Sequence, residues 1–168
     1  MLPFPLKFNI SHTPSMIVLA VTNDQEIGVD VESMSRDIAT DDLAHYAFSP
    51  EEYGQLAGID PQRFQERFFD FWTLKEAYIK ACGMGLSIPL DSFSFSISDT
   101  NRVSIQFGAE RVDDPAKWKF WQLKPLQKFA ISIALKCKDP GDSFRLTMRN
   151  TIPLLADSLT DYKITMHS

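Results

Sequence analysis

The first third of the chain carries short apolar and alternating segments of the kind that form β-strands. Residues 7–10 indicate a short strand, and residues 16–22 form an apolar, β-branched run that predicts a buried one. Residues 27–32 alternate between apolar and polar side chains. Only the polar residues 23–26 separate these last two segments, so we expect residues 16–22 and 27–32 to pair as a hairpin.

The middle of the chain carries helix signals. Residues 40–47 predict a short helix, and the segment S-P-E-E at residues 49–52 is a start signal, with serine as the N-cap and proline in the first turn. A longer helix is expected to open at Pro61 and to end near Cys82, before Gly83.

Further strands are expected in the second half of the chain, at residues 93–97, 103–107, 118–123 and 129–135. Beyond the turn-rich residues 139–142 the pattern weakens. We therefore assign residues 1–142 to one domain and residues 143–168 to a peripheral C-terminal segment. Strands, then helices, then strands predict an α+β fold in which an antiparallel sheet packs against one long helix.

Charge is unevenly distributed along the 168 residues. Residues 1–100 carry 6 basic and 15 acidic side chains, residues 101–168 carry 11 and 7, and the formal net charge is -5. This balance argues against nucleic-acid binding. The acidic half would repel a phosphorylated ligand unless a metal cation lay between them, although a solvated acidic surface is the simpler explanation of most of these charges.

The sequence also bears on location. No segment is apolar enough for a membrane span, and the N-terminus lacks the features of a secretory signal. The two cysteines, Cys82 and Cys137, lack metal-ligand spacing. We expect both to be reduced thiols of a cytoplasmic protein.

Asp30 and Glu32 form the first candidate site. On a strand, Gly28, Asp30 and Glu32 share one face, with the Cα atoms of the two acids roughly 6.5–7 Å apart. Two carboxylates so placed can converge on a hard divalent cation, and Gly28 leaves space for a ligand. Taken alone, the pair is more simply explained as two solvated acids on an exposed strand face.

The second candidate lies on the expected long helix. Trp72, Glu76 and Lys80 fall on one stripe, with Lys75 on its flank. Glu76 could give a third oxygen to a metal or take a proton, while Lys80 neutralises a phosphate. The simpler explanation is an i,i+4 salt bridge between Glu76 and Lys80.

A third candidate is the pair Ser11-His12, which follows the first short strand. Both side chains could donate hydrogen bonds to a phosphate, although a lone histidine in a turn is more often structural.

These features occur in a specific order, as F-N-I-S-H-T at residues 8–13, I-G-V-D-V-E at 27–32 and F-W-T-L-K-E-A-Y-I-K at 71–80. The segment G-M-G-L-S-I-P-L at 83–90 follows. In this order the chain resembles the Sfp-type 4'-phosphopantetheinyl transferases of the holo-acyl-carrier-protein synthase superfamily, over residues 8 to about 95.

The resemblance implies an enzyme that moves the 4'-phosphopantetheine group of coenzyme A onto a serine of an apo acyl or peptidyl carrier protein. It implies a Mg²⁺ ion, or Mn²⁺, held by Asp30, Glu32 and Glu76. Glu76 would be the base and Lys80 would contact the phosphates, so the catalytic residues would be Glu76, Lys80 and Asp30. Coenzyme A would be bound by Ser11, His12, Lys75 and Lys80, with His12 near the 3'-phosphate, and Trp72 would fix the helix.

The carrier protein is expected to dock on segment 40–70, where Phe48, Tyr53, Leu56 and Phe64 are candidates for apolar contact, unless they lie in the core. Members of the family usually have two similar subdomains, and most of the first has no counterpart here. The chain could be a truncated form, a self-associating unit that shares sites between copies, or an inactive remnant.

Two other functions remain open. One is a non-catalytic module that binds coenzyme A or a carrier protein. The other is a metal-dependent nuclease or phosphohydrolase built on Asp30, Glu32, Glu76 and Lys80, against which the lack of a basic, aromatic stripe counts.

Overall fold

The computed structural model describes residues 5–152, 154–160 and 162–168 of the chain, and of Leu86 it describes the backbone alone. The strands are β1 (Leu6–Thr13), β2 (Met16–Asn23), β3 (Ile27–Ser33), β4 (Phe93–Ile97), β5 (Val103–Phe107), β6 (Trp118–Leu123), β7 (Phe129–Lys136), β8 (Arg149–Ile152), β9 (Ala156–Leu159) and β10 (Ile164–His167). The helices are α1 (Asp41–Ala47), α2 (Pro50–Ala57) and α3 (Pro61–Ala81).

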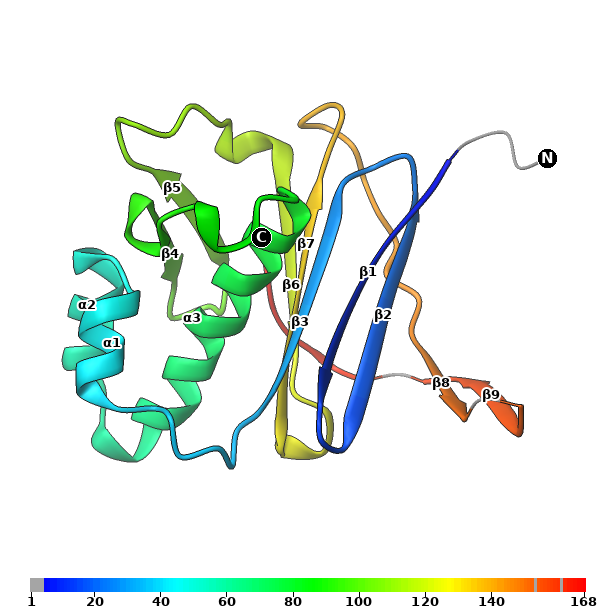
Figure 1. Cartoon of the computed structure of the whole chain (residues 1–168), viewed down its shortest axis with the longest axis horizontal. Helices are drawn as coiled ribbons and strands as arrows, with labels where there is room; N and C mark the ends of the chain where they lie inside the picture. Colours follow the sequence, from blue (N-terminus) through cyan, green and yellow to red (C-terminus); the bar gives the residue numbers. More distant parts are fainter. Residues whose placement is uncertain (1–4, 153, 161) are drawn as a thin grey trace.

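A four-stranded antiparallel sheet in the order β10-β6-β7-β3 forms the centre of the molecule. Figure 1 shows the helices on one side of this sheet and the β1–β2 hairpin on the other. β7 reads F-A-I-S-I-A-L-K and is buried along nearly its whole length, because both faces of this central strand are covered. The predicted α+β fold, an antiparallel sheet packed against a long helix, is confirmed.

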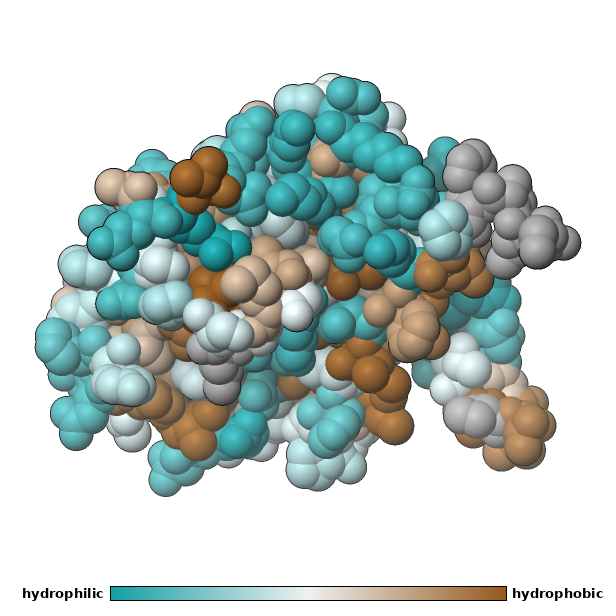
Figure 2. Space-filling model, turned by 45° about the horizontal axis from the view of Figure 1, so that its top comes forward, coloured by the Kyte–Doolittle hydropathy of each residue, from teal (hydrophilic) through white to brown (hydrophobic). Residues whose placement is uncertain are grey.

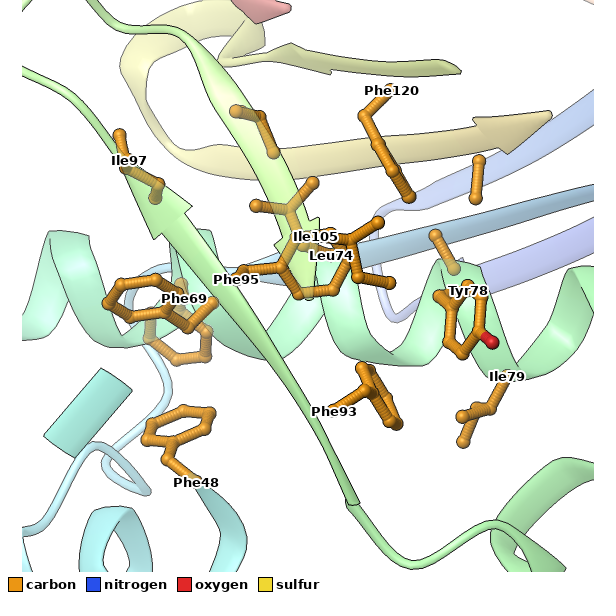
Figure 3. Packing of buried hydrophobic residues seen from close by; sticks show 14 of the residues in the cluster. Phe48, Phe69, Leu74, Tyr78, Ile79, Phe93, Phe95, Ile97, Ile105 and Phe120 are labelled. Carbon is orange, nitrogen blue, oxygen red and sulfur yellow. The ribbon is translucent and has the colours of Figure 1, made fainter. Parts of the chain in front are cut away.

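The long helix α3 lies across β3 and β7. Its N-cap is Asp60, whose side chain accepts a hydrogen bond from the amide of Gln62, and Pro61 occupies the first turn, as the sequence predicts. Its buried residues meet α1, α2 and the β4–β5 pair in the main apolar core. Figure 3 shows Leu74 and Tyr78 of α3 pointing toward Phe93, Phe95 and Phe120.

The predicted hairpin between residues 16–22 and 27–32 is wrong. β2 pairs with β1 over their whole length, and β3 pairs with β7. β1 lies along β3 without joining its sheet, because side chains make the bonds between them: the Val29 amide donates to Asn9 Oδ1 at 3.0 Å and the Val31 amide to Ser11 Oγ at 3.2 Å. Alternation thus predicted the strands but not their partners.

The expectation that residues 16–22 form a buried strand is also wrong. Ala20 faces a second apolar core that includes Val29 and Val31 of β3 and Ile133 of β7. The alternate residues of β2 point outward, and Ile17 is 72% exposed. A continuous apolar run predicts burial on both faces, whereas this strand is covered on one face only.

The C-terminal segment, residues 143–168, is peripheral only in part. β8 and β9 form a separate two-stranded ribbon that projects from the body of the molecule, as Figure 1 shows. β10 instead pairs with β6 at the edge of the central sheet, and Met166 is buried in the main core. This strand packs with the predicted domain 1–142, although the weak pattern after residue 142 assigned it to the peripheral segment.

No helix within the described ranges is long and apolar enough to cross a membrane.

Candidate active site

Asp30 lies in the middle of β3, opposite Ser132 of β7, and is 5% exposed. The predicted alternation of β3 holds, since Val29 and Val31 face the second core while Asp30 faces α3. The expectation that Gly28 leaves space for a ligand is wrong. A Cβ at Gly28 would overlap the carbonyl oxygen of Ala77 and lie 2.5 Å from the amide nitrogen of Ala81, so α3 itself fills that space.

Lys80 joins α3 to both strands beside it. Its ammonium donates to Asp30 Oδ1 at 2.6 Å and to Ser11 Oγ at 3.1 Å, and the Ser11 hydroxyl donates to the same Asp30 oxygen at 2.9 Å. Lys80 therefore forms its salt bridge with Asp30, and the i,i+4 salt bridge with Glu76 that would explain it more simply is not formed. Instead, Lys80 neutralises the nearly buried charge of Asp30.

The second oxygen of Asp30, Oδ2, is buried and has no hydrogen-bond partner within the described part of the chain. A buried carboxylate oxygen is normally bonded, so Oδ2 keeps an unused capacity to accept a hydrogen bond or to bind a cation. Asp30 therefore has one satisfied oxygen and one unbonded oxygen.

Glu76 lies one helical turn before Lys80 and is half-buried. Burial raises the pKa of the Glu76 carboxyl above its ordinary value, the Asp30 and Glu32 carboxylates add to this rise, and the Lys80 ammonium opposes it. The three acids are thus close enough to act on one another electrostatically. Glu32 is held elsewhere, by a 2.6 Å salt bridge with Arg36.

The carboxylates are not gathered at ligand distances. Among the described residues, no group of three or more histidine, cysteine or acidic side chains is arranged to hold a metal ion. Trp72, the third residue of the helical stripe, is partly buried and stacks on Phe68 with 5.8 Å between ring centroids. Both rings belong to α3, so this stacking lies within the helix, and the role of Trp72 in fixing the helix stays a prediction.

Ser11 and His12 point to opposite faces of β1, since neighbouring residues of a strand alternate. Ser11 is buried against Asp30, whereas His12 is exposed and lines an open cavity of about 1020 Å³. Arg36 and Lys128 line the same cavity, and so does Thr13, whose buried hydroxyl has no partner among the described residues. The cavity is therefore cationic and suited to an anionic ligand.

Sequence reasoning missed Arg36, Lys128 and Thr13. Lys128 belongs to the basic second half of the chain, so the charge distribution held a signal for it. Its place beside His12 depends on the turn between β6 and β7, which lies far from β1 in the sequence.

The structure does not bring Lys75 into this group. Its ammonium lies 2.7 Å from Glu52 of α2 and donates to the carbonyl oxygens of Leu90 and Phe93. The side chains of Lys75 and Glu52 are 1% and 0% exposed. This placement favours a structural role for Lys75 over the predicted contact with coenzyme A.

The four apolar candidates for carrier docking belong mostly to the core. Phe48 and Leu56 are buried, and Tyr53 and Phe64 are partly buried against the same cluster. The surface of segment 40–70 therefore offers less apolar area than its sequence indicated.

Comparison with known proteins supplies a family. The model of the 4'-phosphopantetheinyl transferase superfamily matches residues 26–134. A 4'-phosphopantetheinyl transferase of Bacillus subtilis is 44% identical over 101 residues, which cover 60% of this chain and 44% of the relative. The 4'-phosphopantetheinyl transferase Sfp of Bacillus subtilis (strain 168) is 35% identical over 127 residues, which cover 76% of this chain and 54% of Sfp. The chain thus spans about half the length of the curated relatives it matches.

Solved structures agree in fold. The holo-[acyl-carrier-protein] synthase of Thermotoga maritima superposes with a TM-score of 0.55 at 19% identity, over 68% of this chain and 64% of that one. The holo-(acyl-carrier-protein) synthase of Bacillus anthracis, in complex with CoA (3',5'-ADP), gives 0.55 at 18% identity, over 66% of this chain and 94% of that one. The part of this chain that superposes on the Bacillus anthracis synthase therefore corresponds to nearly the whole of that shorter protein.

Proposed function

The chain belongs to the 4'-phosphopantetheinyl transferase superfamily, and we propose that it transfers the 4'-phosphopantetheine group of coenzyme A to a serine of an apo carrier protein. One arrangement carries the proposal. Asp30 is neutralised on one oxygen by Lys80 and has no hydrogen-bond partner among the described residues on the other, with the Glu76 carboxyl nearby at a raised pKa. Such a site can hold a positive charge, a phosphate and a proton acceptor side by side.

The unbonded oxygen of Asp30 supplies an acceptor of the kind that a divalent cation needs. Asp30, Glu32 and Glu76 would hold a Mg²⁺ ion, because hard carboxylate oxygens suit that ion, and Mn²⁺ would fit the same set. When bound, the ion would neutralise negative charge on the pyrophosphate of coenzyme A. Glu32 would first have to leave Arg36, which it now binds.

The side chains have separable tasks in the transfer. The hydroxyl oxygen of the carrier serine bonds to the β-phosphorus of coenzyme A, and Glu76 takes the proton of that hydroxyl. At the same time the bond between this phosphorus and the bridging oxygen breaks, and that oxygen leaves with adenosine 3',5'-bisphosphate. A carboxyl with a raised pKa is a better base near neutral pH. Lys80 stabilises charge on the phosphate oxygens. The cavity lined by His12, Arg36 and Lys128 accommodates the nucleotide phosphates.

A second candidate, a module that binds coenzyme A without catalysis, is favoured by one observation. Asp30 is paired with Lys80 and Glu32 with Arg36, so two of the three proposed metal ligands are already engaged. Nothing on the surface of the described residues favours the phosphohydrolase. The cytoplasmic location stays a prediction.

Incubation with coenzyme A, Mg²⁺ and an apo carrier protein, followed by intact-mass measurement, tests the transferase. The carrier should gain the mass of one phosphopantetheine, and Asp30→Ala and Glu76→Ala should both lose this transfer by more than a hundredfold. Asp99→Ala, an exposed acid in a turn, is the matched control and should keep full activity. No mass gain, together with coenzyme A binding in calorimetry, would favour the binding module.

Metal binding has its own readout. A ligand that binds only the folded chain raises its melting temperature, so Mg²⁺ should raise the Tm of the wild-type chain. The same rise in Asp30→Asn would contradict the assignment of Asp30 as a ligand.

A further inference from the structure

Three polar side chains lie side by side across the central sheet, on the face that α3 covers. Gln122 of β6 is directly opposite Ser132 of β7, and Ser132 is directly opposite Asp30 of β3. Gln122 and Ser132 are fully buried, and Asp30 is nearly so. Polar side chains normally lie on the surface, where Figure 2 shows hydrophilic residues over much of the molecule, so this buried row needs a physical explanation.

Hydrogen bonds connect this row to the middle of α3. The Gln122 amide nitrogen donates to Ser132 Oγ at 3.1 Å, and the hydroxyl oxygens of Ser132 and Thr73 lie 2.7 Å apart. Thr73 uses its only hydroxyl proton to donate to the Phe69 carbonyl oxygen at 2.8 Å, so Ser132 is the donor to Thr73. Gln122, Ser132 and Thr73 thus form a directed series of bonds from β6 through β7 to α3, which we call the polar bridge.

Stability does not account for the polar bridge. The side-chain oxygen of Gln122, Oε1, is buried and has no hydrogen-bond partner within the described ranges. An unbonded buried polar atom costs free energy, and a partly bonded network is less favourable than an apolar core. Ala130 and Ala134, the neighbours of Ser132 on the same face of β7, pack in the main core. An apolar residue at position 132 would simply continue that core.

Small side chains line the contact of α3 with β3. Thr73, Ala77 and Ala81 are spaced four residues apart and so form one ridge of the helix. Ala77 and Ala81 lie against Gly28, which sets how closely α3 approaches β3. Apolar contact has no preferred direction, so these side chains do not select one position of α3 along its own axis. A hydrogen bond is directional, and the bond between Ser132 and Thr73 selects that position.

The polar bridge ends beside the residues of the proposed site. Thr73 lies about one helical turn before Glu76 and two turns before Lys80. Ser132 is the direct neighbour on β7 of Asp30, the acid that Lys80 binds at 2.6 Å. The bridge therefore ties the helix that carries Glu76 and Lys80 to the place on the sheet where Asp30 lies.

We propose that the polar bridge positions α3, so that Glu76 and Lys80 meet Asp30 in the geometry that transfer requires. Its three members are positioning residues, which act through the placement of the helix and touch no reacting atom. The expected effect on rate rests on the proposed function, whereas the effect on the contact between Lys80 and Asp30 does not. A misplacement of about 1 Å is enough to lower the rate of an enzymatic step on the order of a hundredfold.

Removal of the Thr73 hydroxyl tests the polar bridge. Thr73→Val keeps the shape of the side chain and breaks the bridge, so kcat of phosphopantetheine transfer should fall about tenfold or more. The dissociation constant of coenzyme A, measured by calorimetry, should stay near the wild-type value, because the cavity that His12 and Lys128 line is built on other elements. Thr73→Ser keeps the hydroxyl and should keep kcat near the wild-type value.

A second measurement does not require activity. The Lys80 ammonium is held by Asp30 and Ser11, and the Lys80 side chain is 28% exposed. If α3 moves along its axis, this ammonium leaves both partners and becomes more accessible. An amine-reactive reagent should then modify Lys80 several-fold faster in Thr73→Val than in the wild-type chain, as peptide mass spectrometry would measure.

Ile97→Val is the matched control for stability. It removes one buried methyl group from the β4–β5 pair, outside the central sheet, and should lower the Tm about as much as Thr73→Val does. Both kcat and the modification of Lys80 should be unchanged in this control. An equal loss of kcat in Ile97→Val and Thr73→Val would overturn the proposal, because loss of stability alone would then explain it.

Two further results would also overturn the positioning role. One is a Thr73→Val variant with wild-type kcat and wild-type modification of Lys80. The other is a Thr73→Ser variant as slow as Thr73→Val, since the hydroxyl would then not be the group that matters. If Thr73→Val does not fold, Ser132→Ala breaks the same bridge and takes its place. A wild-type chain that transfers nothing would refute the proposed function, and the modification of Lys80 would then decide the positioning role by itself.

Discussion

The Glu76 carboxyl lies where ionisation is unfavourable. Burial raises its pKa first, and the Asp30 and Glu32 charges raise it further. The folded chain therefore holds the Glu76 proton more tightly than the unfolded chain does. This contribution to stability is complete below the ordinary pKa of 4.5 and is lost as the pH rises through the raised folded-state value.

Glu76→Gln should for that reason be more stable than the wild-type chain at pH 7.5. Removal of like-charge repulsion contributes a few tenths of a kcal/mol, which raises the Tm by about 1 °C in a domain of this size. The difference should shrink toward pH 5, as scanning fluorimetry at both pH values would reveal. An equal Tm difference at both pH values would contradict a raised pKa of Glu76 in the folded chain. The variant should lose transfer activity whichever Tm difference is found.

The Lys75–Glu52 pair is a buried contact between α3 and α2. Burial lowers the pKa of Lys75 and raises that of Glu52, so each charge depends on the other. Glu52 also accepts from the amides of Ser49 and Phe95, and so ties α2 to β4. Helical spacing placed Lys75 on the flank of the stripe formed by Trp72, Glu76 and Lys80, but periodicity does not report which partner a buried lysine meets.

Lys75→Met should destabilise the chain by about 3 kcal/mol or more, because it leaves a buried carboxylate unpaired. Urea denaturation measures this loss. Lys75→Met combined with Glu52→Gln should recover part of it, since no buried charge then remains. A double variant as unstable as the sum of its two single changes would show that the pair is not coupled.

At the scale of elements, the site depends on the close approach of α3 to β3. Gly28 permits it, since a Cβ there would overlap the backbone of Ala77. This contact sets where Glu76 and Lys80 lie relative to Asp30. The glycine of the G-x-D-x-E pattern is therefore a packing residue.

Gly28→Ala should cost about 3 kcal/mol, because helix backbone cannot move aside as a flexible side chain can. It should also lower transfer in the protein that remains folded, since α3 moves away from Asp30. Gly54→Ala is the matched control: Gly54 lies in α2, where an added Cβ would meet nothing within 4 Å, and the change should stabilise by about 0.5–1 kcal/mol. Equal stability of the two variants would refute the close-packing argument.

The sequence predicted most elements but not all of their neighbours. Start signals placed the beginnings of α2 and α3, Gly83 placed the end of α3, and alternation placed the faces of β3. Chain proximity suggested that β2 pairs with β3, whereas β7, about a hundred residues later, is the true partner. At the site, spacing alone aligned Glu76 with Lys80, but only the fold shows that Lys80 turns to Asp30 and that His12 faces away from Ser11.

At the scale of the whole molecule, the C-terminal strand closes the core. β10 covers the free edge of β6, and Met166 enters the cluster formed by α3 and the central sheet. Ion pairs also join the acidic first part of the chain to the basic second part, since Lys124 binds Glu66 and Asp70, and Lys138 binds Asp24.

Met166→Ala should therefore destabilise the chain by about 2–3 kcal/mol, the usual cost of removing a buried methionine side chain. Chemical denaturation measures this, and Leu155→Ala in the exposed β8–β9 ribbon is the control, with a change within about 0.5 kcal/mol. If Met166→Ala were as stable as this control, β10 would contribute little to the free energy of unfolding.

The side-chain bonds between β1 and β3 have a consequence for how relatives are recognised. Asn9 and Ser11 stand in the first block of the family's pattern, yet both satisfy backbone amides of β3. Loss of either acceptor would leave a backbone amide of β3 without a hydrogen-bond partner. Both residues would therefore be retained for folding even in a chain without catalytic activity. A match to this block therefore reports shared architecture, and inherited chemistry has to be judged at Glu76 and Lys80.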